Sequence, residues 1–120
     1  MRLEIETVAH GEVTVVHCRG RLIYGEQADS LRERVNAVLQ QTPRIVFHLG
    51  GVSDMDSGGI GRVVGMVVSA RRAGGDIKFC HLTPHVEHVL QITGLLAVFQ
   101  VFATEEEALR AFAGGVQASA

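Results

Sequence analysis

The sequence contains few cysteines, no tryptophan, a single tyrosine and no long run of charge of either sign. Its 120 residues include only two cysteines, Cys18 and Cys80, and both fall within strand-like segments. This count is too low for a disulfide framework, so a reducing, cytoplasmic setting is the simplest expectation. Residues 1–6 contain no continuous apolar stretch, which argues against a signal peptide or a membrane span at that point.

The charge balance argues against two classes of binding surface. The formal net charge is −2, and acidic and basic residues are interspersed. Proteins that bind nucleic acids or anionic membranes need a basic patch, so we expect neither nucleic-acid binding nor direct membrane insertion. Hydrophobic residues make up 47% of the chain, which indicates a folded domain rather than a disordered one.

Hydrophobic periodicity predicts a single α/β domain with the element order β-β-α-β-α-β-α-β-α. The expected strands cover residues 3–8, 13–18, 44–49, 77–82 and 98–102, and the expected helices cover residues 28–39, 60–72, 84–94 and 104–112. Strands separated by helices pair in parallel, so we expect a mixed, mostly parallel sheet of about five strands with an N-terminal antiparallel hairpin and about four helices. The domain should cover residues 1–113, followed by a flexible tail at 114–120.

Segment 52–61, with the sequence VSDMDSGGIG, is the most informative part of the chain. An apolar strand leads into it and a helix with a regular valine stripe leaves it, so carboxylates, hydroxyls and three glycines gather at a strand-to-helix junction. Asp56 or Ser57 is expected to cap the helix. Each glycine in a helix is less favourable than alanine by about 1 kcal/mol, which predicts that something approaches this backbone closely. A docking or anion-binding role follows.

Common nucleotide-binding motifs do not fit this turn. A P-loop requires a lysine after its second glycine, and none is present here. The glycines at 59, 61 and 65 are spaced one residue too widely for the dinucleotide-binding fingerprint. Asp76, the candidate ribose partner, lies at the start of a strand rather than at its end. We therefore expect no cofactor.

The motif and its position resemble those of STAS domains, the family of anti-sigma-factor antagonists and of related modules in sulfate transporters. Asp-Ser-x-Gly-Ile-Gly at 56–61 lies between an apolar strand and a valine-rich helix, as in that family. The resemblance extends over nearly the whole chain and includes residues 18–20, 74–75, 90–96 and 107–109. It implies the α/β fold of a single STAS-like domain.

The resemblance also implies a protein-interaction module without catalysis. In such antagonists the partner is both an anti-sigma factor and an ATP-dependent serine kinase, and the unphosphorylated antagonist binds it and frees the sigma factor. Phosphorylation at the helix start adds about −1.5 to −2 charge and disturbs the docked surface. The family's phosphoacceptor position is Gly58 in this chain, and glycine cannot be phosphorylated. Either Ser57 is the phosphoacceptor candidate, or this switch is absent.

A docking face is expected where the motif turn meets the loop around Tyr24, because in a fold of this kind both emerge at the same end of the sheet. The expected partner-binding residues are Tyr24, Glu26, Asp54, Asp56, Ser57, Gly58, Gly59 and Arg62. Arg62 could pair with Asp54 or Asp56, or contact a phosphate of the partner.

Three histidines, His17, His48 and His81, each lie late in a predicted strand, with Cys18 and Cys80 beside the first and the last. Imidazole and thiolate are suitable zinc ligands, but ligands must share one face of the sheet. The simpler expectation is three unrelated histidines at the border of the core and no metal site. A further pair at 85 and 88 has no third ligand nearby.

Two other functions stay open at this point. Asp54-Met55-Asp56-Ser57 resembles the Asp-x-Asp-x-Thr signature of haloacid-dehalogenase-like phosphatases, so a small phosphatase using Asp54 or Asp56 is one alternative. The only lysine is Lys78, which leaves such chemistry without an obvious cation clamp. The other alternative is an anion- or nucleotide-sensing STAS module of a transporter or a stressosome-like assembly. The N-terminal edge strand could also pair two chains into a homodimer.

Overall fold

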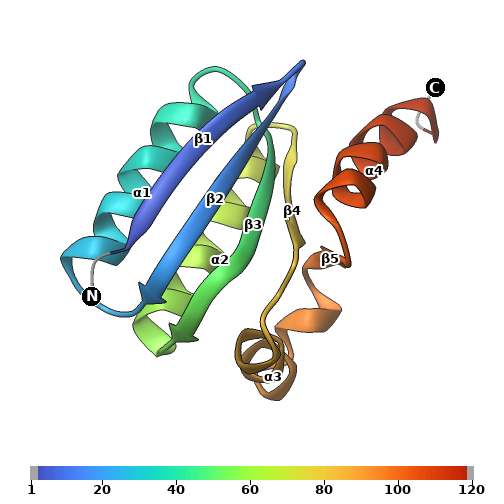
Figure 1. The fold of residues 1–120 in the computed structure, drawn as a ribbon. Coiled ribbons are helices and arrows are strands. Elements are labelled where there is room, and N and C mark those ends of the chain that lie inside the picture. Colours follow the sequence, from blue (N-terminus) through green and yellow to red (C-terminus); the bar gives the residue numbers. More distant parts are fainter. Residues whose placement is uncertain (1–2, 119–120) are drawn as a thin grey trace.

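The computed structural model describes residues 3–118 and has the predicted order of elements, with one short 3₁₀ helix added (Figure 1). The strands are β1 (Glu4–His10), β2 (Val13–Leu22), β3 (Arg44–Met55), β4 (Asp76–Cys80) and β5 (Gln100–Phe102). The helices are α1 (Glu26–Leu39), α2 (Ser57–Arg72), α3 (Pro84–Ile92), the 3₁₀ helix η1 (Leu95–Ala97) and α4 (Glu105–Ala118).

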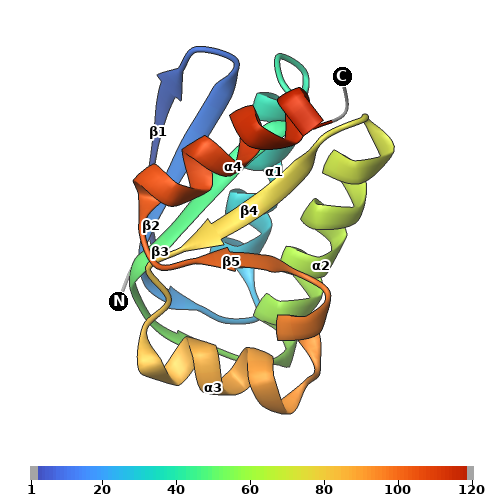
Figure 2. The ribbon, with the colours of Figure 1, turned by 90° about the vertical axis from the view of Figure 1, so that its right-hand side faces the viewer.

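The five strands form one sheet in the order β1-β2-β3-β4-β5. β1 is antiparallel to β2, and the other neighbouring strands are parallel. Helices α1 and α2 cover one face, α4 covers the other, and α3 lies beyond the carboxyl ends of the central strands (Figure 1 and Figure 2). The described residues therefore confirm the predicted α/β class, the antiparallel hairpin and the mostly parallel sheet.

Two apolar cores result from the alternation of side chains along the central strands. Phe47 and Leu49 belong to the larger core under α1 and α2, where Phe47 stacks on Phe79 with ring centroids 5.8 Å apart. Val46 points to the opposite face and packs in the smaller core with Phe112 of α4. Because both faces of β3 are covered, its first half is an almost continuous apolar run.

Strands β2 and β3 are longer than predicted, and this changes the shape of the motif. β3 reaches Met55, so residues 52–55 belong to a strand rather than to a turn, and β2 reaches Leu22 rather than ending at 18. The added residues pair with each other, Arg21 with Asp54 and Leu22 with Met55, after two irregularities in the register. As a result, the short loop after β2 lies directly beside the start of α2.

Three of the helices begin with side-chain caps, and one of them is the cap expected from Asp56 or Ser57. The side chain of Asp56 accepts a hydrogen bond from the Gly59 N–H at the start of α2, and Thr83 caps α3. At the start of α4, the Glu107 N–H donates to Thr104 and the Thr104 N–H donates back to Glu107, which is a complete capping box. These caps depend only on neighbours within one helical turn, so they could be found from the sequence.

The last helix, α4, continues to Ala118, beyond the domain boundary expected at residue 113. Residues 119–120 of the expected tail lie outside the described residues. Among residues 3–118, no helix combines the length and the apolar character needed to cross a membrane.

Candidate functional site

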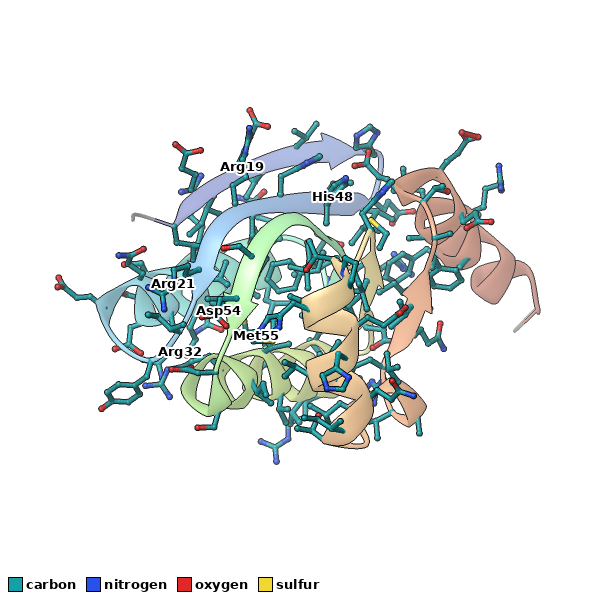
Figure 3. All side chains as sticks on the ribbon, turned by 60° about the horizontal axis from the view of Figure 1, so that its bottom comes forward. Arg19, Arg21, Arg32, His48, Asp54 and Met55 are labelled. Atoms are coloured by element: carbon teal, nitrogen blue, oxygen red, sulfur yellow. The ribbon has the colours of Figure 1, made fainter. Side chains whose placement is uncertain are left out.

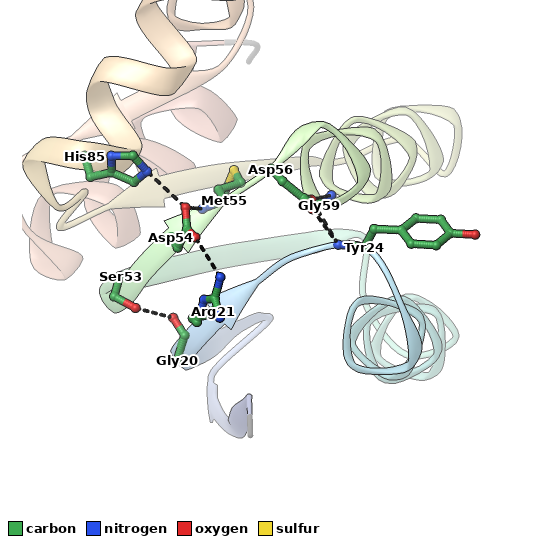
Figure 4. Close-up of polar contacts among 9 residues, drawn as sticks. All are labelled: Gly20, Arg21, Tyr24, Ser53, Asp54, Met55, Asp56, Gly59 and His85. Carbon is green, nitrogen blue, oxygen red and sulfur yellow. Dashed lines mark hydrogen bonds and ion pairs between the residues drawn. The ribbon is translucent and has the colours of Figure 1, made fainter. Parts of the chain in front are cut away.

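The end of the sheet where β2 and β3 finish carries the polar residues of the motif, and Figure 3 shows Arg21, Asp54 and Met55 close together there. Asp56, immediately after β3, connects this end to the loop before α1. Its carboxylate accepts the Tyr24 N–H at 2.9 and 3.1 Å and the Gly59 N–H at 2.8 Å (Figure 4). A single carboxylate thus caps α2 and holds the 23–25 loop against it.

Gly58 and Gly59 allow this loop to approach the first turn of α2. A Cβ atom on Gly59 would lie 2.0 Å from the Leu22 carbonyl oxygen, and one on Gly58 would lie 2.9 Å from the Tyr24 Cα. The chain itself therefore fills the space beside both glycines, and the close approach expected at this backbone comes from Leu22 and Tyr24 of the same chain. Gly61 differs, because it is exposed and has open space around its missing side chain.

Asp54 forms a second polar cluster, with residues from two other elements. One carboxylate oxygen lies 3.2 Å from the Arg21 guanidinium, and the other lies 3.1 Å from Nε2 of His85 on α3 (Figure 4). The hydrogen bond with His85, followed by that from Arg21, lowers the pKa of Asp54 below its ordinary value. Asp54 is therefore ionised and held in place at neutral pH.

Arg62 does not pair with Asp54 or Asp56, and the prediction of those pairs is wrong. Its Nε atom lies 2.7 Å from Oδ1 of Asp29 on α1. Asp29 belongs to α1, which lies beside α2 on the same face of the sheet (Figure 1). The ion pair joins the two helices rather than contributing a free cation to the motif.

Tyr24, Glu26 and Ser57 are expected partner-binding residues whose side chains are exposed, and we call this set the Tyr24 surface. Tyr24 is 75% exposed and points away from the domain (Figure 4). Glu26 is exposed at the first residue of α1, and Ser57 is exposed at the first residue of α2. An aromatic ring, a hydroxyl and a carboxylate at one end of the sheet are suited to protein recognition.

The comparisons with known proteins decide the family. The sequence model described as STAS domain matches residues 4–108. The chain belongs to the STAS domain family. The chain is also similar to an anti-sigma F factor antagonist from Paenibacillus polymyxa, with 30% identity over 111 residues that cover 91% of this chain and 94% of that protein.

Two further relatives place this STAS domain more closely. An anti-sigma-B factor antagonist of Bacillus subtilis is 32% identical over 90 residues, which cover 75% of this chain and 76% of that protein. The structure of the anti-sigma factor antagonist SpoIIAA in its unphosphorylated form has a TM-score of 0.78 and 25% identity, covering 92% of this chain and 97% of that one. The chain is thus an anti-sigma-factor-antagonist-like STAS domain.

Sequence reasoning missed Arg21 and His85 as neighbours of Asp54 in this STAS domain. Arg21 lies beyond the strand expected at 13–18, and only the register of β2 against β3 places it opposite Asp54. His85 comes from the helix after the next strand, so no spacing in the sequence relates it to Asp54. The sequence feature that could have indicated a polar cluster here is the group of polar residues at the ends of β2 and β3.

Proposed function

We propose that this STAS domain is an anti-sigma factor antagonist without catalytic activity of its own. It binds an anti-sigma factor of the ATPase and serine-kinase type in the cytoplasm, and this frees the sigma factor to direct transcription. The names of the relatives from Paenibacillus polymyxa and Bacillus subtilis support this function. The proposal assigns the contact to the Tyr24 surface.

The observation that supports the proposal most is that Tyr24 combines an exposed aromatic ring with a backbone that is held in place. The Tyr24 ring is 75% exposed, while its N–H is bound by Asp56 and its Cα lies against Gly58. Large aromatic side chains are frequent energetic centres of protein interfaces. A ring whose backbone is already ordered loses little additional entropy on binding, so it is a favourable anchor.

Regulation in this chain differs from that expected for the family at the phosphoacceptor position. Gly58 has no hydroxyl, and the space that a side chain would need at this position is occupied by Tyr24. We therefore propose that docking is not switched by phosphorylation at 58. Ser57 carries the only hydroxyl in segment 54–61, so it is the candidate if the turn is modified at all.

The phosphatase alternative has less support from the geometry. Both oxygens of Asp56 accept backbone N–H groups, and Asp54 is bound by Arg21 and His85. A carboxylate nucleophile needs a lone pair directed at the substrate, together with cations that stabilise the transferred phosphoryl group. Arg21 is engaged by Asp54, and Arg62 by Asp29.

Calorimetric titration of the purified chain into the ATPase-type anti-sigma factor encoded nearest to its gene tests the proposal. Wild-type protein should bind, and Tyr24→Ala should weaken binding at least tenfold, or about 1.4 kcal/mol. His10→Ala is the matched control, because it removes an exposed ring at the opposite end of the β1–β2 hairpin. Absence of wild-type binding, or equal losses in both variants, would contradict the proposal.

Incubation of the complex with ATP tests the proposal that docking is not switched by phosphorylation. We expect phosphosite mass spectrometry to find no stoichiometric modification of segment 54–61. Modification of Ser57, abolished in Ser57→Ala and accompanied by release of the partner, would show instead that the switch has moved by one residue.

A further inference from the structure

The three histidines that were expected to be unrelated form a continuous row. His17 on β2 and His48 on β3 are register partners, and their rings stack with centroids 4.7 Å apart. His48 also stacks on His81, with centroids 4.3 Å apart. Register partners on neighbouring parallel strands project from the same face of a sheet, so the strand pairing brings the first two rings together. This corrects the sequence-based expectation.

The backbone around the row makes room for the rings. His81, directly after β4, has a φ of 55°, a conformation that residues other than glycine adopt infrequently. This turn of the chain places its ring against His48 rather than leaving it on the opposite face. Gly50 lacks the Cβ atom that would lie 2.7 Å from Cε1 of His48 and 3.3 Å from the Cβ of His81. A larger residue at 50 would displace the two rings.

A carboxylate completes the group from the α4 side of the sheet. Glu105, the first residue of α4, places Oε1 3.2 Å from Nε2 of His17. His17, His48 and Glu105 each offer one ligand atom, and all three atoms lie within 4.8 Å of one another. Bonds of 2.0 to 2.1 Å in a tetrahedral zinc site place ligand atoms about 3.3 Å apart, so the His17 and His48 rings must rotate out of their stacked arrangement to direct both nitrogens at one ion.

We propose that His17, His48 and Glu105 form a binding site for a divalent transition-metal ion of the zinc type, with water at the remaining position. Two imidazoles and a carboxylate are a ligand set suited to such ions. The side chains of His17 and Glu105 are 31% and 28% exposed, so an ion can reach them from solvent. A bound ion would join α4 to β2 and β3, away from the Asp54 cluster (Figure 3).

A second group, His48, Cys80 and His81, shares His48 with this site but is less suitable. Cys80 is fully buried in the smaller apolar core, beside Val46 and Phe112. An ion would have to enter this core to reach the sulfur, whereas His17 and Glu105 are accessible from solvent. The His17, His48 and Glu105 group requires no buried thiolate, and its carboxylate supplies the negative charge.

Calorimetric titration of the tag-free, EDTA-treated full chain with ZnCl₂ tests the site. We expect one ion per chain, and at least a tenfold loss of zinc affinity in Glu105→Gln and in His48→Ala. Mutation of a residue that only supports a metal ligand lowers metal affinity by about 10–100-fold, so removal of a ligand itself should cost at least as much. Glu106→Gln removes the same charge from the same turn of α4, and His88→Ala removes an exposed imidazole on α3. Both controls should bind zinc like the wild-type chain.

Absorption spectra with CoCl₂ identify the ligands independently of affinity. We expect visible d–d bands without a thiolate-to-cobalt charge-transfer band, and unchanged spectra in Cys80→Ser. A charge-transfer band that Cys80→Ser removes would overturn the assignment in favour of the other group. Absence of stoichiometric zinc binding by the wild-type chain, or equal losses in Glu105→Gln and Glu106→Gln, would overturn the proposal altogether. Circular dichroism of Glu105→Gln, whose side chain is partly exposed, confirms that loss of affinity is not loss of folding.

Discussion

The carboxylate of Asp56 accepts the backbone N–H of Tyr24 at 2.9 Å, although the two residues are 32 positions apart in the sequence. The same carboxylate caps α2 through Gly59. This one side chain therefore links the last residue before α2 to the loop that presents the exposed tyrosine. It is the structural centre of the proposed docking region.

Removing that carboxylate should destabilise the domain. Asp56→Ala loses the cap of α2 and the contact with Tyr24, and we expect the free energy of unfolding to fall by about 1–2 kcal/mol or more. Asp56→Asn keeps one side-chain oxygen that can cap the helix, so its loss should be smaller. Urea unfolding of both variants measures the difference. Equal stability of Asp56→Ala and the wild type would contradict the role assigned to this residue.

Two glycines in the same helix should respond to alanine in opposite directions. In Gly59→Ala the new Cβ meets the Leu22 carbonyl oxygen at 2.0 Å, so the strand or the helix must move, and we expect a loss of about 1–3 kcal/mol. In Gly61→Ala nothing lies within 4 Å of the new atom. This second change should stabilise the helix by up to about 1 kcal/mol, the usual advantage of alanine over glycine. Thermal unfolding of the two variants side by side tests this, and a loss in Gly61→Ala would show that the close approach extends further along α2.

Asp54 should make stability depend on pH in the acidic range. The hydrogen bond with His85, and then that from Arg21, lowers the pKa of Asp54 in the folded protein. The pKa of an aspartate in an unfolded chain is about 3.9. The stabilisation is therefore fully present above the unfolded pKa and is lost as the pH falls through the folded one. Urea unfolding measured at a series of pH values, from neutral pH down through the unfolded pKa, should show a shallower decline for Asp54→Asn than for the wild type. Parallel curves would show that the cluster does not contribute.

The ion pair between Arg62 and Asp29 should contribute little by itself. The side chains are 34% and 42% exposed, so solvent screens their attraction. A double-mutant cycle with Arg62→Ala and Asp29→Ala should give a coupling energy of about 0.2–1 kcal/mol that decreases with added salt. A coupling that exceeds this range and does not depend on salt would show that the pair is shielded from water in solution.

Local features of this fold could be predicted from the sequence, while the composition of its polar clusters could not. The nearly continuous apolar run at the start of β3 is typical of a strand covered on both faces, and the caps by Asp56, Thr83 and Thr104 involve only residues within one turn. The same local pattern carried the resemblance to STAS domains. The neighbours of Gly58 and Gly59 could not be predicted, because the sequence does not show that Leu22 and Tyr24 occupy the space beside them.

The sequence by itself determined the order of the elements, the start of α2 and the family, because each depends on neighbouring residues and on their spacing. Only the tertiary structure decided that Arg21 and His85 meet at Asp54, that Arg62 pairs with Asp29, and that three histidines stack in a row. The contact of Arg21 with Asp54 and the stack of His17 on His48 depend on the register of β2 against β3, with its irregularities after His17 and Gly20. A shift of one residue in a strand turns every side chain to the other face, so a pattern along one chain cannot specify which groups meet.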